Sequence, residues 1–140
     1  MARGRGIVGT AALVLFVGCA AQGPEAAFEE ALEGVRKGDA RAVAERLSPR
    51  FEGPDGMDRG TAVFALAALF KGGKVGVTVL SQHVTLEGPS AATQTADLLF
   101  THREGGALLP DDGGRRHALI RWERRGGAWL VREYREVGGS

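Results

Sequence analysis

The first regular pattern of apolar and polar positions along the chain indicates a helix over residues 25–37. Its apolar side chains are spaced i, i+3, i+4 and i+7, which places them on one helical face: Phe28, Ala31, Leu32 and Val35. Pro24 suits the start of such a helix, and Gly38 suits its end. The segment is therefore predicted to be amphipathic, with its apolar face turned toward a core.

A second, shorter helix is predicted to begin after Asp39, which can cap it. Val43 and Leu47 supply its apolar positions, and the helix is expected to stop near Pro49, because the residue before a proline disfavours helix. Residues 50–60 are rich in glycine and proline and are predicted to form a loop.

The third predicted helix covers residues 61–70, with the sequence TAVFALAALF. Thr61 can cap its start, and Gly72-Gly73 can end it. Because the segment is apolar nearly all round, it is expected to be the most buried helix of the domain.

From residue 75 onward the spacing of the apolar side chains changes to two, which indicates strands. Four are predicted, over residues 75–88, 92–102, 116–125 and 128–137. In the second of them, alternate residues share one face: Ala92, Gln94, Ala96, Leu98 and Phe100. Gly126-Gly127 is typical of a two-residue hairpin turn between the last two strands.

Helices followed by hairpin-connected strands predict an α+β domain, with N-terminal helices packed on one face of a four-stranded antiparallel sheet. This order of elements, closing with RWERRGGAWLVREY at residues 121–134, resembles the NTF2-like (SnoaL-like, cystatin-like cone) superfamily. The resemblance covers residues 25–137, with residues 138–140 as a tail. It implies a strongly curved sheet that wraps around a helix and encloses an apolar cavity. A generic domain of helices and a strand meander is the alternative.

The first eighteen residues have the pattern of an export signal. Residues 1–6 carry Arg3 and Arg5, and residues 7–18 are uncharged and apolar. Twelve residues in a helix reach roughly 18 Å, which is short of a hydrocarbon core of about 30 Å. A cleaved signal is therefore favoured over a membrane-spanning anchor.

The sequence FVGC at residues 16–19 resembles a bacterial lipobox, although Phe16 stands where leucine is usual. The resemblance implies cleavage between Gly18 and Cys19 and acyl chains on Cys19, which would begin a lipidated tether of residues 19–24. Two or more chains anchor a protein stably in a membrane. An ordinary cleaved signal is the alternative. The expected location is the cell envelope, on the outer membrane facing the periplasm, with the outer side of the inner membrane as the alternative.

The net charge bears on which partners the chain can bind, and the cysteine count bears on whether it can form a disulfide. Net charge is +1, and removal of residues 1–18 takes the 18 basic residues to 16 against 17 acidic ones, a net charge of −1. Such a balance disfavours nucleic-acid binding. One cysteine cannot form an intramolecular disulfide, so the domain depends on its core alone.

Four polar residues are candidates to line a pocket: Asp97, His117, Arg121 and Tyr134. Asp97 can act as a general base if burial raises its pKa, and the alternative is a solvated residue on the polar face of its strand. Arg121 and Tyr134 can hold an anion, whereas alternation with glutamates favours exposed cross-strand pairs. The three histidines, His83, His102 and His117, lack metal-binding spacing, so no metal and no cofactor are expected.

These features favour a binding module over an enzyme. The first hypothesis is a lipid-anchored envelope protein whose cone binds a small apolar ligand or docks another envelope protein. The second is an isomerase or dehydratase with Asp97 as base inside the cone. The third is a structural envelope protein that acts as a homodimer. The fold alone does not choose among them.

Overall fold

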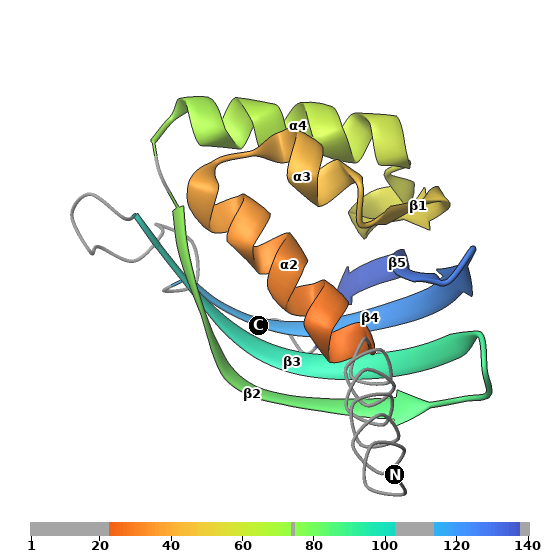
Figure 1. Ribbon diagram of the computed structural model, residues 1–140. Coiled ribbons are helices and arrows are strands. Elements are labelled where there is room, and N and C mark those ends of the chain that lie inside the picture. The colour runs from red at the N-terminus through yellow and green to blue at the C-terminus, as the bar shows by residue number, and fades with distance from the viewer. Residues whose placement is uncertain (1–22, 74, 103–113, 138–140) are drawn as a thin grey trace, which may run out of the picture.

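The computed structural model describes residues 23–73, 75–102 and 114–137, which form helices on one side of a curved sheet (Figure 1). The predicted signal peptide and Cys19 lie outside the described residues. The helices are α2 (Pro24–Lys37), α3 (Ala40–Ala44) and α4 (Arg59–Lys71), with a short 3-10 turn η1 (Pro54–Gly56). The strands are β1 (Leu47–Glu52), β2 (Val75–Leu86), β3 (Ala91–His102), β4 (Arg115–Arg125) and β5 (Ala128–Glu136). None of the described helices is long and apolar enough to cross a membrane.

The sheet has five strands in the order β1-β5-β4-β3-β2, which corrects the expectation of four antiparallel strands. Strands β2 to β5 are antiparallel neighbours, but β1 pairs in parallel with β5. Strand β1 occupies the positions predicted as the end of the second helix and the start of a loop. Pro49 is tolerated there because β1 is an edge strand, and Leu47 and Phe51 are buried. The pairing with β5 is long-range, so the local sequence does not reveal it.

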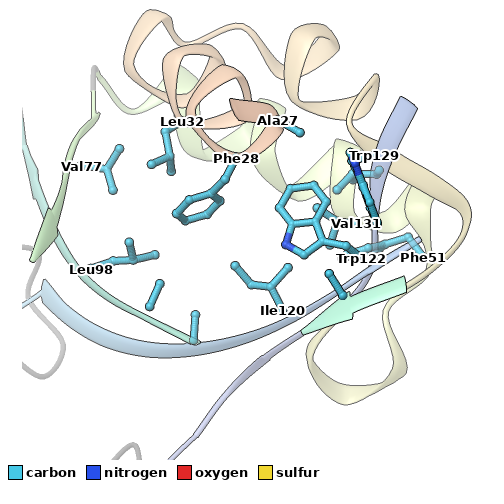
Figure 2. Close-up of a cluster of buried hydrophobic side chains, with 14 of the residues drawn as sticks. Ala27, Phe28, Leu32, Phe51, Val77, Leu98, Ile120, Trp122, Trp129 and Val131 are labelled. Carbon is cyan, nitrogen blue, oxygen red and sulfur yellow. The ribbon is translucent and has the colours of Figure 1, made fainter. Parts of the chain in front are cut away.

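Helix α2 follows the predicted pattern and lies in the concavity of the sheet (Figure 1). Phe28 and Leu32 are buried, and Phe28 meets Trp122 of β4 edge to face, with ring centroids 6.5 Å apart. Figure 2 shows these side chains converging with Leu98 and Ile120 from the inner face of the sheet. This cluster is the core of the domain.

Helix α4 corrects two predictions. Its N-cap is Asp58, whose Oδ1 accepts a hydrogen bond from the Thr61 N–H at 2.8 Å, so Thr61 lies inside the helix. The helix was expected to be the most buried, yet Ala62 is its one buried residue, and Phe64 is 78% exposed. Helix α4 packs on α3 and β1. It lies on the side of α2 that faces away from most of the sheet (Figure 1), and Phe64 and Leu69 are exposed on it.

The structure confirms which strand residues share a face, and it confirms the predicted turn between the last two strands. Ala92, Gln94, Ala96 and Leu98 are buried on the inner face of β3. Gly126 and Gly127 have φ of 57° and 84°, as a type I′ hairpin turn requires.

Gln94 is a fully buried polar residue of this inner face. It accepts a hydrogen bond from Trp122 Nε1 at 2.9 Å and donates one to Gln82 Oε1 at 2.7 Å, so its amide is satisfied inside the core.

Candidate functional site

An apolar cavity of about 340 Å³ lies between α2, α4, β1 and the inner face of the sheet. Helix α2 contributes the face that the sequence pattern predicted, with Phe28, Leu32 and Val35 in its wall. The sheet contributes a second wall, and its members are Leu98, Phe100, Ile120 and Val131. Both walls follow from local periodicity, because alternate residues of a strand and every third or fourth residue of a helix share a face.

Helix α4 forms the third wall, and its residues were not among the predicted site residues. Ala62, Ala65, Leu66 and Leu69 line the cavity from this helix. The unusual apolar content of residues 61–70 is the sequence feature that corresponds to this wall, but such content also predicts a buried helix. Because one side of α4 faces a cavity and the other faces solvent, few of its large side chains are buried.

Tyr134, on β5, is the single lining residue in the described chain whose side chain carries a hydroxyl, amide or charge. Its hydroxyl lies 3.4 Å from Glu136 Oε2, within reach of a weak hydrogen bond. Burial, and then the charge and hydrogen bond of Glu136, raise the pKa of the Tyr134 hydroxyl well above its ordinary value. The hydroxyl therefore stays protonated at physiological pH.

Asp97 and His117 lie on the opposite face of the sheet from the cavity. They are register partners on β3 and β4, and His117 Nδ1 contacts Asp97 Oδ1. Ser81 Oγ donates to Asp97 Oδ2 at 3.1 Å, and the three residues line an open outer depression of about 270 Å³. His83 lines the same depression. Both oxygens of Asp97 have partners, so its carboxylate is satisfied at the surface.

Arg121 also lies on the outer face, where its Nε is 3.4 Å from Glu133 Oε1, and its side chain is 56% exposed. This is the exposed cross-strand pair that alternation favoured. The four candidate residues therefore do not form one site. Tyr134 faces the cavity, whereas Asp97, His117 and Arg121 lie outside it, and the cavity wall contains no carboxylate or imidazole among the described residues.

A separate polar network ties the added strand β1 to β4. Buried Ser48 donates to Glu123, and Arg50 pairs with the same carboxylate. Burial alone would raise the pKa of Glu123, but the hydrogen bonds from Ser48 and Arg50, with the charges of Arg50 and Arg125, lower it overall. These contacts join residues of β1 and β4 that are more than seventy positions apart in the sequence.

Within the described residues, no group of three or more His, Cys, Asp or Glu side chains is arranged to hold a metal ion. The cavity offers no oxygen or nitrogen ligands beyond the Tyr134 hydroxyl. What the geometry can do is enclose an apolar molecule and offer it one hydrogen-bonding group.

Comparison with known proteins identifies the architecture. No protein-family profile matches the chain, and no curated protein matches it. Solved structures do. An uncharacterised protein with a cystatin-like fold from Caulobacter vibrioides aligns with a TM-score of 0.63 at 18% identity, covering 80% of this chain and 84% of that one. The chain has an NTF2-like, cystatin-like fold.

Two further structures place the same fold in other bacteria. An NTF2-like protein from Cytophaga hutchinsonii aligns with a TM-score of 0.60 at 14% identity, covering 79% of this chain and 90% of that one. An NTF2-like protein of unknown function from Pseudomonas putida aligns with a TM-score of 0.63 at 12% identity, covering 80% and 81%. At these identities the NTF2-like likeness concerns the fold, so function has to be argued from the site.

Proposed function

We propose that this chain is a lipid-anchored cell-envelope protein whose NTF2-like domain binds a small apolar ligand in the cavity between α2, α4 and the sheet. The observation that carries the proposal is the cavity itself: about 340 Å³, lined by apolar side chains and one tyrosine. Small-molecule sites are typically concave, mostly apolar and about 300–1,000 Å³ in volume. The cavity is at the small end of that range.

The same geometry supports binding without catalysis. An isomerase or dehydratase needs an acid or base within hydrogen-bond reach of its substrate. Asp97 and His117 are separated from the cavity by the sheet, since they lie on its outer face. The proposal for the cavity therefore includes no proton-transfer step.

The anchor is supported by the order of charge, apolar run, small residue and cysteine in residues 1–19. The described domain begins at Gly23, so cleavage before Cys19 removes none of it. The five residues from Ala20 to Pro24 span at most about 17 Å when fully extended. The proposal thus places the cavity close to a membrane, where apolar molecules are concentrated.

Ligand binding is tested with an unlipidated secreted chain, made by an ordinary cleavable signal and Cys19→Ser, and purified without detergent. Ala65 lines the cavity from α4, and Ala65→Trp fills part of it. The matched control is Ala68→Trp, on the same helix but outside the lining. Titration with N-phenyl-1-naphthylamine is expected to show roughly tenfold weaker binding for Ala65→Trp and unchanged binding for Ala68→Trp. Equal affinity of the two variants would contradict a site in the cavity.

The anchor is tested by Cys19→Ala in the full chain. Without the thiol that accepts the diacylglyceryl group, the chain is expected to leave the membrane fraction or to accumulate as uncleaved precursor. Fractionation and metabolic labelling with an alkyne fatty acid measure both. A normally processed Cys19→Ala chain that still requires detergent for release would refute lipidation.

A further inference from the structure

Strand β2 is one of the two edges of the sheet, and none of the described strands pairs with its outer side (Figure 1). The first part of this edge is covered, because Val77 is buried and Arg36 of α2 donates from Nε and Nη2 to the Val77 carbonyl oxygen at 3.2 and 3.1 Å. A β-bulge between Val79 and Ser81 separates this part from the rest of the strand. The open part of the edge is therefore residues 80–86.

Residues 80–86 have the composition of a strand that can pair with another strand. Their sequence is LSQHVTL, which contains no Asp, Glu, Lys, Arg, proline or glycine, and every residue except Val84 is exposed. Leu80 is 47% exposed and Leu86 is 63% exposed. Proteins usually protect an open edge with charges, proline or bulges, and here the bulge at Leu80 protects one end only. The other edge of the sheet, β1, is six residues long and contains Pro49.

The backbone groups that point away from the sheet belong to the even-numbered residues of this edge. The Glu87 N–H donates to the Ala91 carbonyl oxygen at 2.8 Å, so Glu87 directs its backbone groups toward β3. The direction alternates along an antiparallel strand, and the register with β3 is unbroken over residues 81–86. The residues that direct their N–H and C=O groups away from the sheet are therefore Gln82, Val84 and Leu86.

The sequence of this edge resembles itself when it is read in the opposite direction. With His83 at the centre, the matching positions are Leu80 and Leu86, Ser81 and Thr85, and Gln82 and Val84. In an antiparallel pair of two copies, this register brings the exposed leucines together and makes Gln82 and Val84 a hydrogen-bonded pair. It brings no carboxylate, lysine or arginine of the segment against another, because the segment has none. A shift of the register in either direction leaves part of residues 80–86 unpaired.

We propose that residues 80–86 form the interface of a homodimer, in which the β2 edges of two copies pair antiparallel about a twofold axis at His83 and join the two sheets into one. The axis is perpendicular to the sheet, so the helices of both copies lie on the same side. The paired segment spans about 24 Å at ~3.4 Å per residue, and a contact this small belongs with the transient interfaces. The dimer is therefore expected to exchange with the monomer. This inference goes beyond the proposed function and does not depend on a ligand in the cavity.

The register is tested by disulfide formation in the unlipidated Cys19→Ser chain, which has no other cysteine. His83→Cys places a thiol at the axis, where opposed residues of a non-hydrogen-bonded pair have Cα atoms about 4.5 Å apart, which a disulfide can bridge. The matched control is Thr85→Cys, an exposed residue of the same strand and the same face of the sheet. Its two copies would lie about 14 Å apart along the strands, which is too far for a disulfide. Oxidation is expected to crosslink His83→Cys roughly tenfold faster than Thr85→Cys.

The association itself is measured by sedimentation equilibrium of the unlipidated chain over a range of concentrations. Leu86→Lys removes both leucine contacts of the dimer and is expected to weaken dimerisation about tenfold. The matched control is Phe64→Lys, because Phe64 is 78% exposed but lies on α4, away from this edge. Phe64→Lys is expected to leave the dimer dissociation constant unchanged. Circular dichroism of each variant checks that the fold is retained.

Three results would overturn the inference. The first is an unlipidated chain that stays monomeric at every concentration, which would leave the β2 edge to an extended segment of another protein. The second is equal crosslinking of His83→Cys and Thr85→Cys, because the two copies would then meet in a different register or on a different surface. The third is equal weakening of the dimer by Leu86→Lys and Phe64→Lys, because the contact would then not be specific to this edge.

Discussion

Helices α2 and α4 are of nearly equal length, 14 and 13 residues, but the more apolar helix, α4, is the less buried of the two. Helix α2 mixes charged and apolar residues, yet its Phe28 is only 6% exposed. Helix α4 is apolar for most of its length, yet its Phe64 is 78% exposed. The difference arises because α2 lies against the sheet, whereas α4 covers the cavity with one face. Burial is decided by the presence of a partner surface, and composition alone does not supply one.

The largest expected effect on stability comes from replacing one phenylalanine by alanine in each helix. Phe28→Ala removes a ring that packs on Trp122, and we expect it to lower the free energy of unfolding by about 3–5 kcal/mol. Phe64→Ala removes an exposed ring and is expected to change it by less than about 0.5 kcal/mol. Urea denaturation of the unlipidated chain measures both. Similar losses for the two variants would mean that α4 has a partner surface in solution.

Replacing one glycine by alanine in each helix is expected to change the free energy of unfolding by a smaller amount, and in opposite directions in the two helices. At Gly34 of α2 an added Cβ would lie 2.9 Å from Val43 Cγ2, so Gly34→Ala forces the α2–α3 contact apart and is expected to cost about 1–3 kcal/mol.

At Gly60 of α4 the nearest atom is Asp58 Oδ1 at 3.8 Å, so Gly60→Ala is expected to stabilise by up to about 1 kcal/mol. Thermal unfolding gives the sign of each. A stabilising Gly34→Ala would show that the two helices are not in close contact.

The smallest expected effect is the pH dependence of the cap of α4. The Thr61 N–H, and then the Thr61 side chain, hydrogen-bond to Asp58 and lower the pKa of its carboxyl. Because the folded-state pKa is lower than the unfolded one, this stabilisation is present above the unfolded pKa and is lost as pH falls through the folded pKa.

Asp58→Asn keeps a capping side chain but does not titrate. The wild-type Tm is therefore expected to fall more steeply than that of Asp58→Asn between about pH 5 and pH 2.5. Parallel Tm profiles would contradict the capping role.

The sequence predicted those parts of the fold whose pattern is local. Helix α2, strands β2 to β5 and the Gly126-Gly127 turn follow from periods of 3.6 and two and from turn chemistry. Strand β1 could not be predicted in the same way. Its pairing with β5 joins residues about eighty positions apart, through contacts such as Leu47 with Val131, and its own sequence contains Pro49 and is followed by glycines.

The candidate site was predicted in part. Tyr134 was a candidate and lies in the cavity wall, and the alternation of β3 already placed Asp97 opposite Leu98 and Ala96. The alternation did not show which of the two faces the helices cover. It therefore did not show which face lines the cavity. The wall formed by α4 was missed because an apolar helix was equated with a buried one.

By itself the sequence determined the amphipathic faces and the hairpin order of the last four strands, because each depends on residues that are close together in the chain. For residues 1–19 the sequence predicts an export signal. The tertiary structure decided the parallel strand β1, the exposure of α4 and the separation of Tyr134 from Asp97 and His117 by the sheet. Each of these depends on which surfaces meet across long stretches of chain, and that is set by packing of the whole domain.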